Sequence, residues 1–318
     1  MPLAFGCGEP GDTRWRTAFD ADDLGWLYSV WGSSEQDIYA VGGKGEVLAG
    51  VAMHFDGDDW QALDLGLSLP ILQWVHGRSP KDVTFVGTRG TIVHWNGSEA
   101  TLQSSPTDAP LWGIWGATSD DLWAVGGGAF EGDEPVLLHF DGAEWTTVTV
   151  PPLTTADVRA FFKVWGSSAN DVYVVGQRGV LLHFDGLTWT EMASGTTEDL
   201  ISIWGTGPNR IVMVGGRSNG VAIVKDKAGV RALAVGNVPA LNGVWLAKGT
   251  KAHAVGIRGT HIEIDLDAPG EARLVDTSTT KDLHGVFGTG NDLYAVGGNL
   301  FASSAPFRGV ALLRNIRE

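Results

Sequence analysis

The chain repeats one short pattern seven times, and this recurrence constrains its fold more than any other feature. In each unit an apolar segment ends in Trp-Gly or a close variant. The marker residues are Trp31, His76, Trp115, Trp165, Trp204, Trp245 and Phe287, separated by 45, 39, 50, 39, 41 and 42 residues. A period of about 40 to 50 residues is typical of folds built from equivalent units that pack side by side.

Each unit carries the signals of four short strands. The second strand has the pattern Asp-x-aromatic-x-Val-Gly, as in 37–42 and 171–176, and the third ends in His-Phe-Asp-Gly or a variant, as in 183–186. Asp-Gly and Asn-Gly favour tight hairpin turns because both residues tolerate positive φ. A tryptophan such as Trp189 then opens a fourth strand. Seven such units predict an all-β, seven-bladed β-propeller of four-stranded antiparallel blades.

The two ends of the chain complement each other. The last unit stops inside its third strand, at 310–314, whereas 12–17 near the N-terminus fits the fourth-strand pattern. We therefore expect the N-terminal strand to complete the last blade and close the ring, because closure removes open sheet edges. The predicted organisation is a leader over residues 1–11 and a single propeller over residues 12–318.

The N-terminal segment and the charge balance bear on location and partners. Small and apolar residues lead to Cys7, the only cysteine, in a pattern similar to the end of a bacterial lipoprotein signal. This predicts a secreted or cell-envelope protein whose only membrane contact is a lipid on Cys7, and the alternative is an unmodified leader. Because 22 Lys and Arg stand against 37 Asp and Glu, for a net charge of −15, we do not expect nucleic acid as a partner.

The run 175–189, VGQRGVLLHFDGLTW, resembles the blades of Asp-box (BNR-type) propellers. The layout is similar to that of seven-bladed photosystem II assembly-factor-like propellers, and Trp-Gly repeats also resemble bacterial envelope or secreted proteins. The pattern covers nearly the whole chain, although His-Phe-Asp-Gly replaces the full Asp-box and the fifth and sixth units depart further. The resemblance implies the fold, an envelope location and, by analogy, an arginine-bearing surface for a protein partner. It does not transfer a function, because propellers host many.

Basic residues recur in the loops between the second and third strands in six units. They are Lys44, Arg89, Arg178, Arg217, Arg258 and Arg308. In a propeller these loops share one face, so we expect a locally positive surface that binds a protein or an anionic ligand. The alternative is that each cation pairs with a nearby carboxylate and braces its own loop. Two longer loops, 126–135 and 297–308, would add an apolar wall from Phe130, Leu300, Phe301 and Phe307.

No catalytic, metal or cofactor motif accompanies the repeat. Four histidines recur once per unit, so they would lie in different blades and could not converge on one metal ion. They are His54, His94, His139 and His183. The sequence predicts a non-enzymatic binding scaffold without a cofactor. Two alternatives stay open: a carbohydrate-binding, lectin-like propeller that stacks sugars on Trp26, Trp74 or Trp112, and a glycosidase or lyase with a carboxylate pair at the channel mouth.

Overall fold

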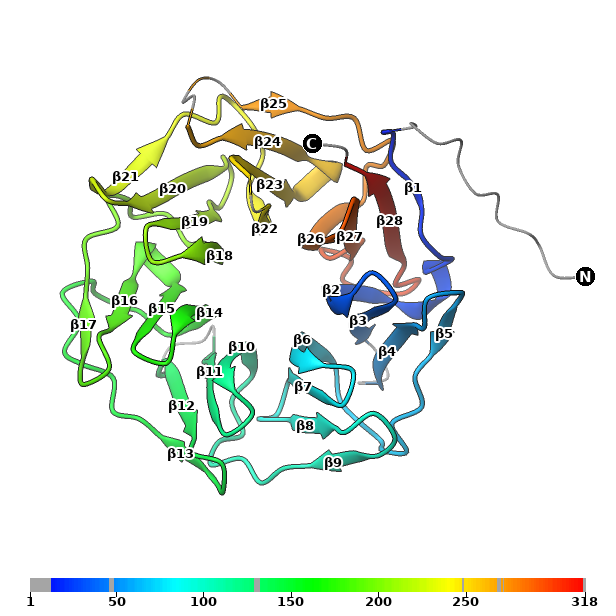
Figure 1. Ribbon diagram of the computed structural model, residues 1–318, viewed down its shortest axis with the longest axis horizontal. Helices are drawn as coiled ribbons and strands as arrows, with labels where there is room; N and C mark the ends of the chain where they lie inside the picture. Colours follow the sequence, from blue (N-terminus) through cyan, green and yellow to red (C-terminus); the bar gives the residue numbers. More distant parts are fainter. Residues whose placement is uncertain are drawn as a thin grey trace, which may run out of the picture.

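The computed structural model describes residues 13–45, 49–128, 132–247, 249–267, 270 and 272–316. In these residues seven four-stranded antiparallel sheets stand radially around one axis (Figure 1), which confirms the predicted seven-bladed propeller. The first strand of each sheet lies nearest the axis and the last lies at the rim. Helical structure among the described residues is limited to three turns: η1 (Asp22–Leu24), η2 (Gln177–Gly179) and η3 (Ile257–Gly259). These residues include no helix with the length and apolarity needed to cross a bilayer.

Blades 1 to 4 each follow the chain from the axis to the rim. Blade 1 contains β2 (Trp26–Ser34), β3 (Asp37–Lys44), β4 (Ala49–Phe55) and β5 (Trp60–Ala62). Blade 2 contains β6 (Leu72–Ser79), β7 (Asp82–Gly87), β8 (Ile92–Trp95) and β9 (Ala100–Leu102). Blade 3 contains β10 (Leu111–Thr118), β11 (Asp121–Gly126), β12 (Val136–Phe140) and β13 (Trp145–Thr147). Blade 4 contains β14 (Phe161–Ser168), β15 (Asp171–Gly176), β16 (Leu181–Phe184) and β17 (Trp189–Glu191).

Blades 5 and 6 keep this order, and blade 7 joins the two ends of the chain. Blade 5 contains β18 (Leu200–Gly207), β19 (Arg210–Gly215), β20 (Val221–Asp226) and β21 (Gly229–Leu233). Blade 6 contains β22 (Leu241–Leu246), β23 (Lys251–Gly256), β24 (His261–Asp265) and β25 (Arg273–Leu274). Blade 7 contains β26 (Asp282–Thr289), β27 (Asp292–Gly298), β28 (Gly309–Asn315) and β1 (Arg16–Thr17).

Strand β1 closes the ring as the sequence predicts. It pairs antiparallel with β28, Arg16 opposite Leu313 and Thr17 opposite Leu312. The backbone N–H of Ala18 adds a hydrogen bond to the carbonyl oxygen of Ala311, at 2.9 Å. The pairing covers the rim edge of β28 and completes the seventh sheet.

The Trp-Gly markers pack one blade against the next. A Cβ added to Gly205 of blade 5 would lie 2.6 Å from the indole of Trp165 in blade 4, and one on Gly288 of blade 7 would lie 2.6 Å from Trp245 in blade 6. The glycine therefore makes room for the tryptophan of the preceding blade. Each such indole buries a large apolar area at a blade interface, which explains why the two residues recur together.

Candidate functional site

Three loops between second and third strands share one unusual backbone conformation. In each of them an arginine with φ between 55° and 58° precedes a glycine with φ between 64° and 76°. The pairs are Arg89–Gly90 in blade 2, Arg178–Gly179 in blade 4 and Arg258–Gly259 in blade 6. Left-handed backbone is costly for a residue with a side chain, and its repetition in alternate blades marks these Arg-Gly turns as candidates for function.

The surrounding backbone enforces the Arg-Gly turns. A Cβ on Gly179 would overlap the carbonyl oxygen of Thr196, and one on Gly259 would overlap that of Thr279. The backbone N–H of Arg178 donates to Oδ1 of Asp199 at 2.8 Å, and that of Arg258 donates to Oδ1 of Asp282 at 2.9 Å. An aspartate of the following blade thus anchors the turns of blades 4 and 6 through their backbone.

The six predicted cations divide into two groups. Arg217 donates two hydrogen bonds of 3.1 Å to Asp199, and Arg308 pairs with Asp22, which also accepts from Lys281 at 2.8 Å. These two arginines therefore follow the alternative in which the cation pairs with a nearby carboxylate and braces its loop. The remaining four are Lys44, Arg89, Arg178 and Arg258.

Among those four, only Arg178 has an ion-pair partner in the described residues. Its Nη2 lies 3.7 Å from Oδ2 of Asp157, and both side chains are about half exposed or more. Lys44, Arg89 and Arg258 are exposed and form no ion pair with the described part of the chain. Their charges are therefore available to a ligand.

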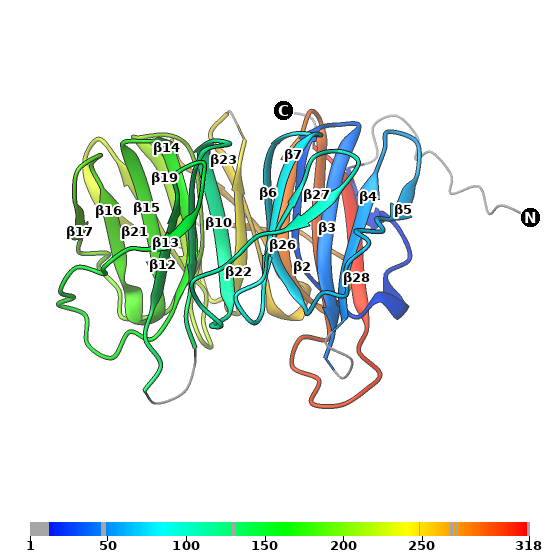
Figure 2. The same ribbon diagram turned by 90° about the horizontal axis from the view of Figure 1, so that it is seen from below.

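We call the face that carries these turns the loop face, defined by residues 88–91, 177–180, 257–260 and 299–308. Figure 2 shows the 299–308 loop extending from the lower face, whereas the C-terminus lies at the upper one. In this loop Phe301 is 79% exposed, while Phe307 packs on Trp26 with ring centroids 4.6 Å apart. The predicted apolar wall is thus partly present, and Phe130 lies outside the described residues.

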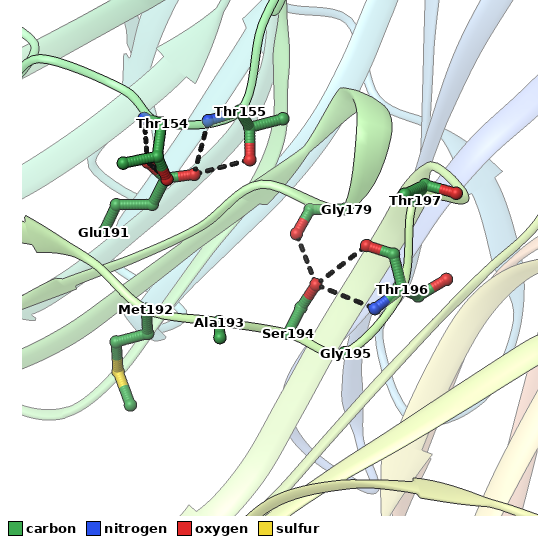
Figure 3. A pocket seen from close by; sticks show the side chains of 10 residues that line it. All are labelled: Thr154, Thr155, Gly179, Glu191, Met192, Ala193, Ser194, Gly195, Thr196 and Thr197. Atoms are coloured by element: carbon green, nitrogen blue, oxygen red, sulfur yellow. Dashed lines mark hydrogen bonds between the residues drawn. The ribbon is translucent and has the colours of Figure 1, made fainter.

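A cavity of about 620 Å³ opens beside the Arg178–Gly179 turn (Figure 3). Both oxygens of Glu191 accept hydrogen bonds from the backbone and hydroxyl groups of Thr154 and Thr155. Burial opposes ionisation, but these four bonds lower the pKa of Glu191 below its usual value. Ser194 donates to the carbonyl oxygen of Gly179 at 2.6 Å. The cavity is a hydroxyl-rich recess of the loop face, and no repeat motif in the sequence indicates it.

The four repeated histidines each contact an aspartate of their own blade. In each of blades 1 to 4 the Nε2 atom of the histidine contacts Oδ1 of the aspartate that opens the second strand. The pairs are His54 with Asp37 at 2.7 Å, His94 with Asp82 at 3.1 Å, His139 with Asp121 at 2.7 Å and His183 with Asp171 at 2.8 Å. The histidines lie in different blades and join the second and third strands of each sheet, so they form no common metal site.

One group of described residues brings three metal-ligand side chains together. Atoms of His253, His261 and Glu263 lie within 4.8 Å of one another, and all three residues are buried. The group does not suit a cation, because Glu263 accepts from Arg314 at 2.7 Å and from Arg273 at 2.5 Å. Two guanidinium groups occupy the carboxylate that a metal ion would need. The sequence pattern indicates no role for either histidine.

A second group that the sequence does not predict lies near the axis. Lys163 is 4% exposed, donates to the carbonyl oxygen of Trp112 at 2.7 Å and stands 4.1 Å from the ring centre of Trp74. Burial lowers its pKa to about 7. His284 donates from Nδ1 to the carbonyl oxygen of Tyr28 at 2.7 Å. The ammonium group of Lys163 therefore covers one face of the Trp74 ring.

Comparison with solved structures shows the fold in other proteins. YCF48 bound to a D1 peptide matches with a TM-score of 0.69 and 11% identity, over 96% of this chain and 97% of that one. The β-propeller domain of Cps50 (Swd1) from Myceliophteria thermophila matches with a TM-score of 0.67 and 10% identity, over 95% and 100%. The WD40 β-propeller domain of Doa1 matches with a TM-score of 0.65 and 8% identity, over 94% and 96%.

Comparison by sequence gives a different result. No protein-family model matches the chain, and no curated protein matches it. At identities of 8% to 11% the structural likeness establishes a shared fold. The Asp-box relationship indicated by the blade motifs stays a prediction, and the chain is a seven-bladed β-propeller.

Proposed function

We propose that this propeller is a non-enzymatic binding scaffold that recognises an acidic protein segment with its loop face. The observation that carries the proposal is the recurrence of the Arg-Gly turn in blades 2, 4 and 6. A chain with a net charge of −15 holds three arginines there in a costly conformation. Among the described residues only Arg178 of these three has an ion-pair partner, and guanidinium groups bind carboxylates with two parallel hydrogen bonds.

The partner class follows from the chemistry of the loop face. Guanidinium groups on separate blades fit carboxylates spread along an extended segment better than one compact ion. Exposed Phe301 adds an apolar contact to the same face. YCF48, which has the same fold, is described bound to a D1 peptide, so a propeller of this layout can bind a peptide.

The alternatives have less support in the contacts. A lectin would need tryptophans with free ring faces. Phe307 packs on Trp26, and Lys163 stands over the ring of Trp74, while the indole N–H of Trp112 donates to Gly127 at 2.9 Å. For a glycosidase, loop-face carboxylates would need to be available. Asp199 is held by Arg217, and Glu191 by the two threonines.

A location in the bacterial cell envelope or outside the cell belongs to the same proposal. Its support is the segment that leads to Cys7, which lies outside the described residues. Metabolic labelling with a fatty-acid analogue tests it: the full chain is expected to incorporate the label and a Cys7→Ser variant is not. Equal labelling of both would contradict a lipid anchor at this cysteine.

The experiment for the binding site selects peptides from a random display library on the intact protein and measures their Kd. A loop-face variant replaces Arg89, Arg178 and Arg258 by Asn, because Asn tolerates left-handed backbone. We expect selected peptides to be rich in Asp and Glu. We expect the variant to weaken their binding by roughly tenfold for each charge-assisted hydrogen bond that it removes.

A matched control keeps the overall charge change equal. It replaces the exposed cations Arg16, Lys81 and Lys227 by Asn, all of which lie away from the loop face. The control should retain the wild-type Kd once both variants are shown to be folded. Selected peptides without acidic residues, or equal losses of affinity in both triple variants, would refute an arginine-based loop-face site.

A further inference from the structure

Blade 6 has a different set of polar residues where blades 1 to 4 each have an internal Asp–His tether. In blade 4 the tether consists of Asp171, Tyr173 and His183, with Tyr173 opposite His183 across the strands. In blade 6 the first of these three positions holds Lys251, and His253 lies opposite Glu263. All three side chains have changed chemical class while the strand register is retained. The fold therefore does not require the tether at these positions, and in blade 6 they carry a separate polar network.

A chain of hydrogen bonds fixes the protons of the two histidines. The indole N–H of Trp15 can only donate, so Nδ1 of His261, 3.1 Å away, accepts. Burial keeps the pKa of His261 well below its usual value, so its single proton lies on Nε2 and points to Nδ1 of His253 at 3.2 Å. Burial also lowers the pKa of His253 to about 4. Neutral His253 therefore carries its proton on Nε2.

Two arginines surround the carboxylate of Glu263. Arg314 of blade 7 donates from Nη1 to Oε1 at 2.7 Å and from Nε to the carbonyl oxygen of Thr13 at 2.6 Å. Arg273 donates from Nε and Nη2 to Oε2 at 3.1 and 2.5 Å. Arg314 occupies the position of Phe184 in blade 4, so a cation has replaced an aromatic ring at the blade interface.

These residues enclose a cavity of about 200 Å³ between blades 6 and 7. Its wall includes Lys251, His253, Arg273, Arg314 and Asn315. Within the described residues, no acceptor takes a hydrogen bond from Nζ of Lys251, Nε2 of His253, Nη1 of Arg273 or Nη2 of Arg314. Three cations and one carboxylate therefore leave the cavity positive and rich in free donors, and His253 is only 3% exposed.

We propose that this cavity binds a small oxyanion of the carboxylate or phosphate class. The ligand would accept from His253 Nε2 and from the guanidinium groups, which prefer planar or tetrahedral oxyanions. The cavity is smaller than the pockets of about 300 Å³ or more that hold drug-sized molecules, which points to a small ligand. Its wall includes Arg314 and Asn315 at the C-terminal end of β28. Figure 2 shows the C-terminus at the face opposite the 299–308 loop, so the cavity is independent of the proposed peptide site.

The site joins three parts of the chain where the ring closes. Thr13 and Trp15 belong to the N-terminal segment, Arg314 to the last strand, and His253 to blade 6. A ligand held by all three would bind the closed ring and not the open one. It would therefore stabilise the folded state by mass action.

The test follows the indole N–H resonance of Trp15 and the imidazole resonances of His253 by NMR in the intact protein. Sodium sulfate and sodium malonate are titrated separately at constant ionic strength, and the two arms separate an inorganic oxyanion from a carboxylate. We expect a saturable shift at both residues with at least one anion. Shifts that grow linearly with both salts, or no shift, would overturn the proposal.

Variants then assign the site. A Lys251→Gln, Arg273→Gln pair removes two exposed cations of blade 6, and it should raise the Kd for the binding anion by about tenfold or more. An Arg231→Gln variant is the control, because Arg231 lies on the rim strand β21 of blade 5 and pairs with Asp226. It should leave the Kd unchanged. Equal Kd values in the wild type and the pair would place the anion elsewhere and refute the site.

Discussion

Blade 4 and blade 6 have the same strand register but use it for different chemistry. In blade 4, Asp171 accepts hydrogen bonds from His183 and Tyr173, each at 2.8 Å, and also from Ser167, so the polar groups satisfy one another within the blade. In blade 6, Glu263 accepts from Arg314 of blade 7, and His253 contacts His261, which accepts from Trp15. One network holds a blade together, whereas the other holds two blades and both ends of the chain.

This difference indicates where the propeller can accept new function. Apolar residues such as Val174 and Ala254 form the same buried core in both blades and leave little freedom. At the polar positions near the strand ends, the only requirement is that every buried polar group has a hydrogen-bond partner. Blade 6 meets that requirement through its neighbour and retains free donors around a cavity, which a self-contained tether cannot provide.

The largest expected effect comes from breaking the charge network of blade 6. Glu263→Gln leaves the buried guanidinium of Arg314 without a counter-charge and should lower the free energy of unfolding by about 3 to 5 kcal/mol. His183→Gln in blade 4 removes a partly buried partner from one aspartate and should cost only about 1 kcal/mol. Denaturant unfolding of both variants measures the difference, and equal losses of stability would contradict the contrast between the blades.

The second effect concerns pH. Burial gives His253 a folded-state pKa of about 4 against its ordinary 6.5, so the unfolded chain binds more protons between these values. The free energy of unfolding should therefore fall as the pH falls through this window, by about 3 kcal/mol from this residue. His253→Tyr, which introduces the blade 4 residue, should flatten the profile. A variant with the wild-type slope between these pH values would show that His253 is not buried in its neutral form.

The third and smallest expected effect is on the free energy of unfolding, when two tryptophans at equivalent rim positions are each replaced by Phe. Trp15→Phe removes the N–H donor to His261 and should cost about 1 to 2 kcal/mol. Trp189→Phe removes a buried N–H that has no partner among the described residues, so it should be nearly neutral or slightly stabilising. Thermal unfolding of both variants provides the measurement. A larger loss of stability at Trp189 would reverse the expected order.

Much of the fold could be predicted because each unit packs for the same physical reasons as the next. Trp165 and Gly205 recur as a pair since one residue fills the space that the other leaves, and the pattern reports this packing directly. The closure by β1 follows from a strand missing at one end and present at the other. The loop positions of the arginines follow from the same register.

The candidate sites could be predicted only in part. The sequence places Arg217 and Arg258 in equivalent loops, but only the structure shows that Asp199 binds the first side chain and that the second forms no ion pair with the described residues. The blade 6 site depends on contacts between distant residues, because Trp15 and His261 are 246 positions apart in the chain. When the seven units are compared by sequence, the residues of blade 6 only appear to have lost the repeat pattern. In the structure these residues contact one another.

The proposed function depends above all on the arginines of the three Arg-Gly turns, which we propose bind carboxylates of a partner segment. A double-mutant cycle tests this directly, pairing Arg258→Asn with removal of single acidic residues from a selected peptide. We expect a coupling energy of about 1.5 kcal/mol or more for one of these pairs. For Arg217, which Asp199 already holds, the coupling should be near zero. No coupling at Arg258 with any peptide carboxylate would contradict the proposed function.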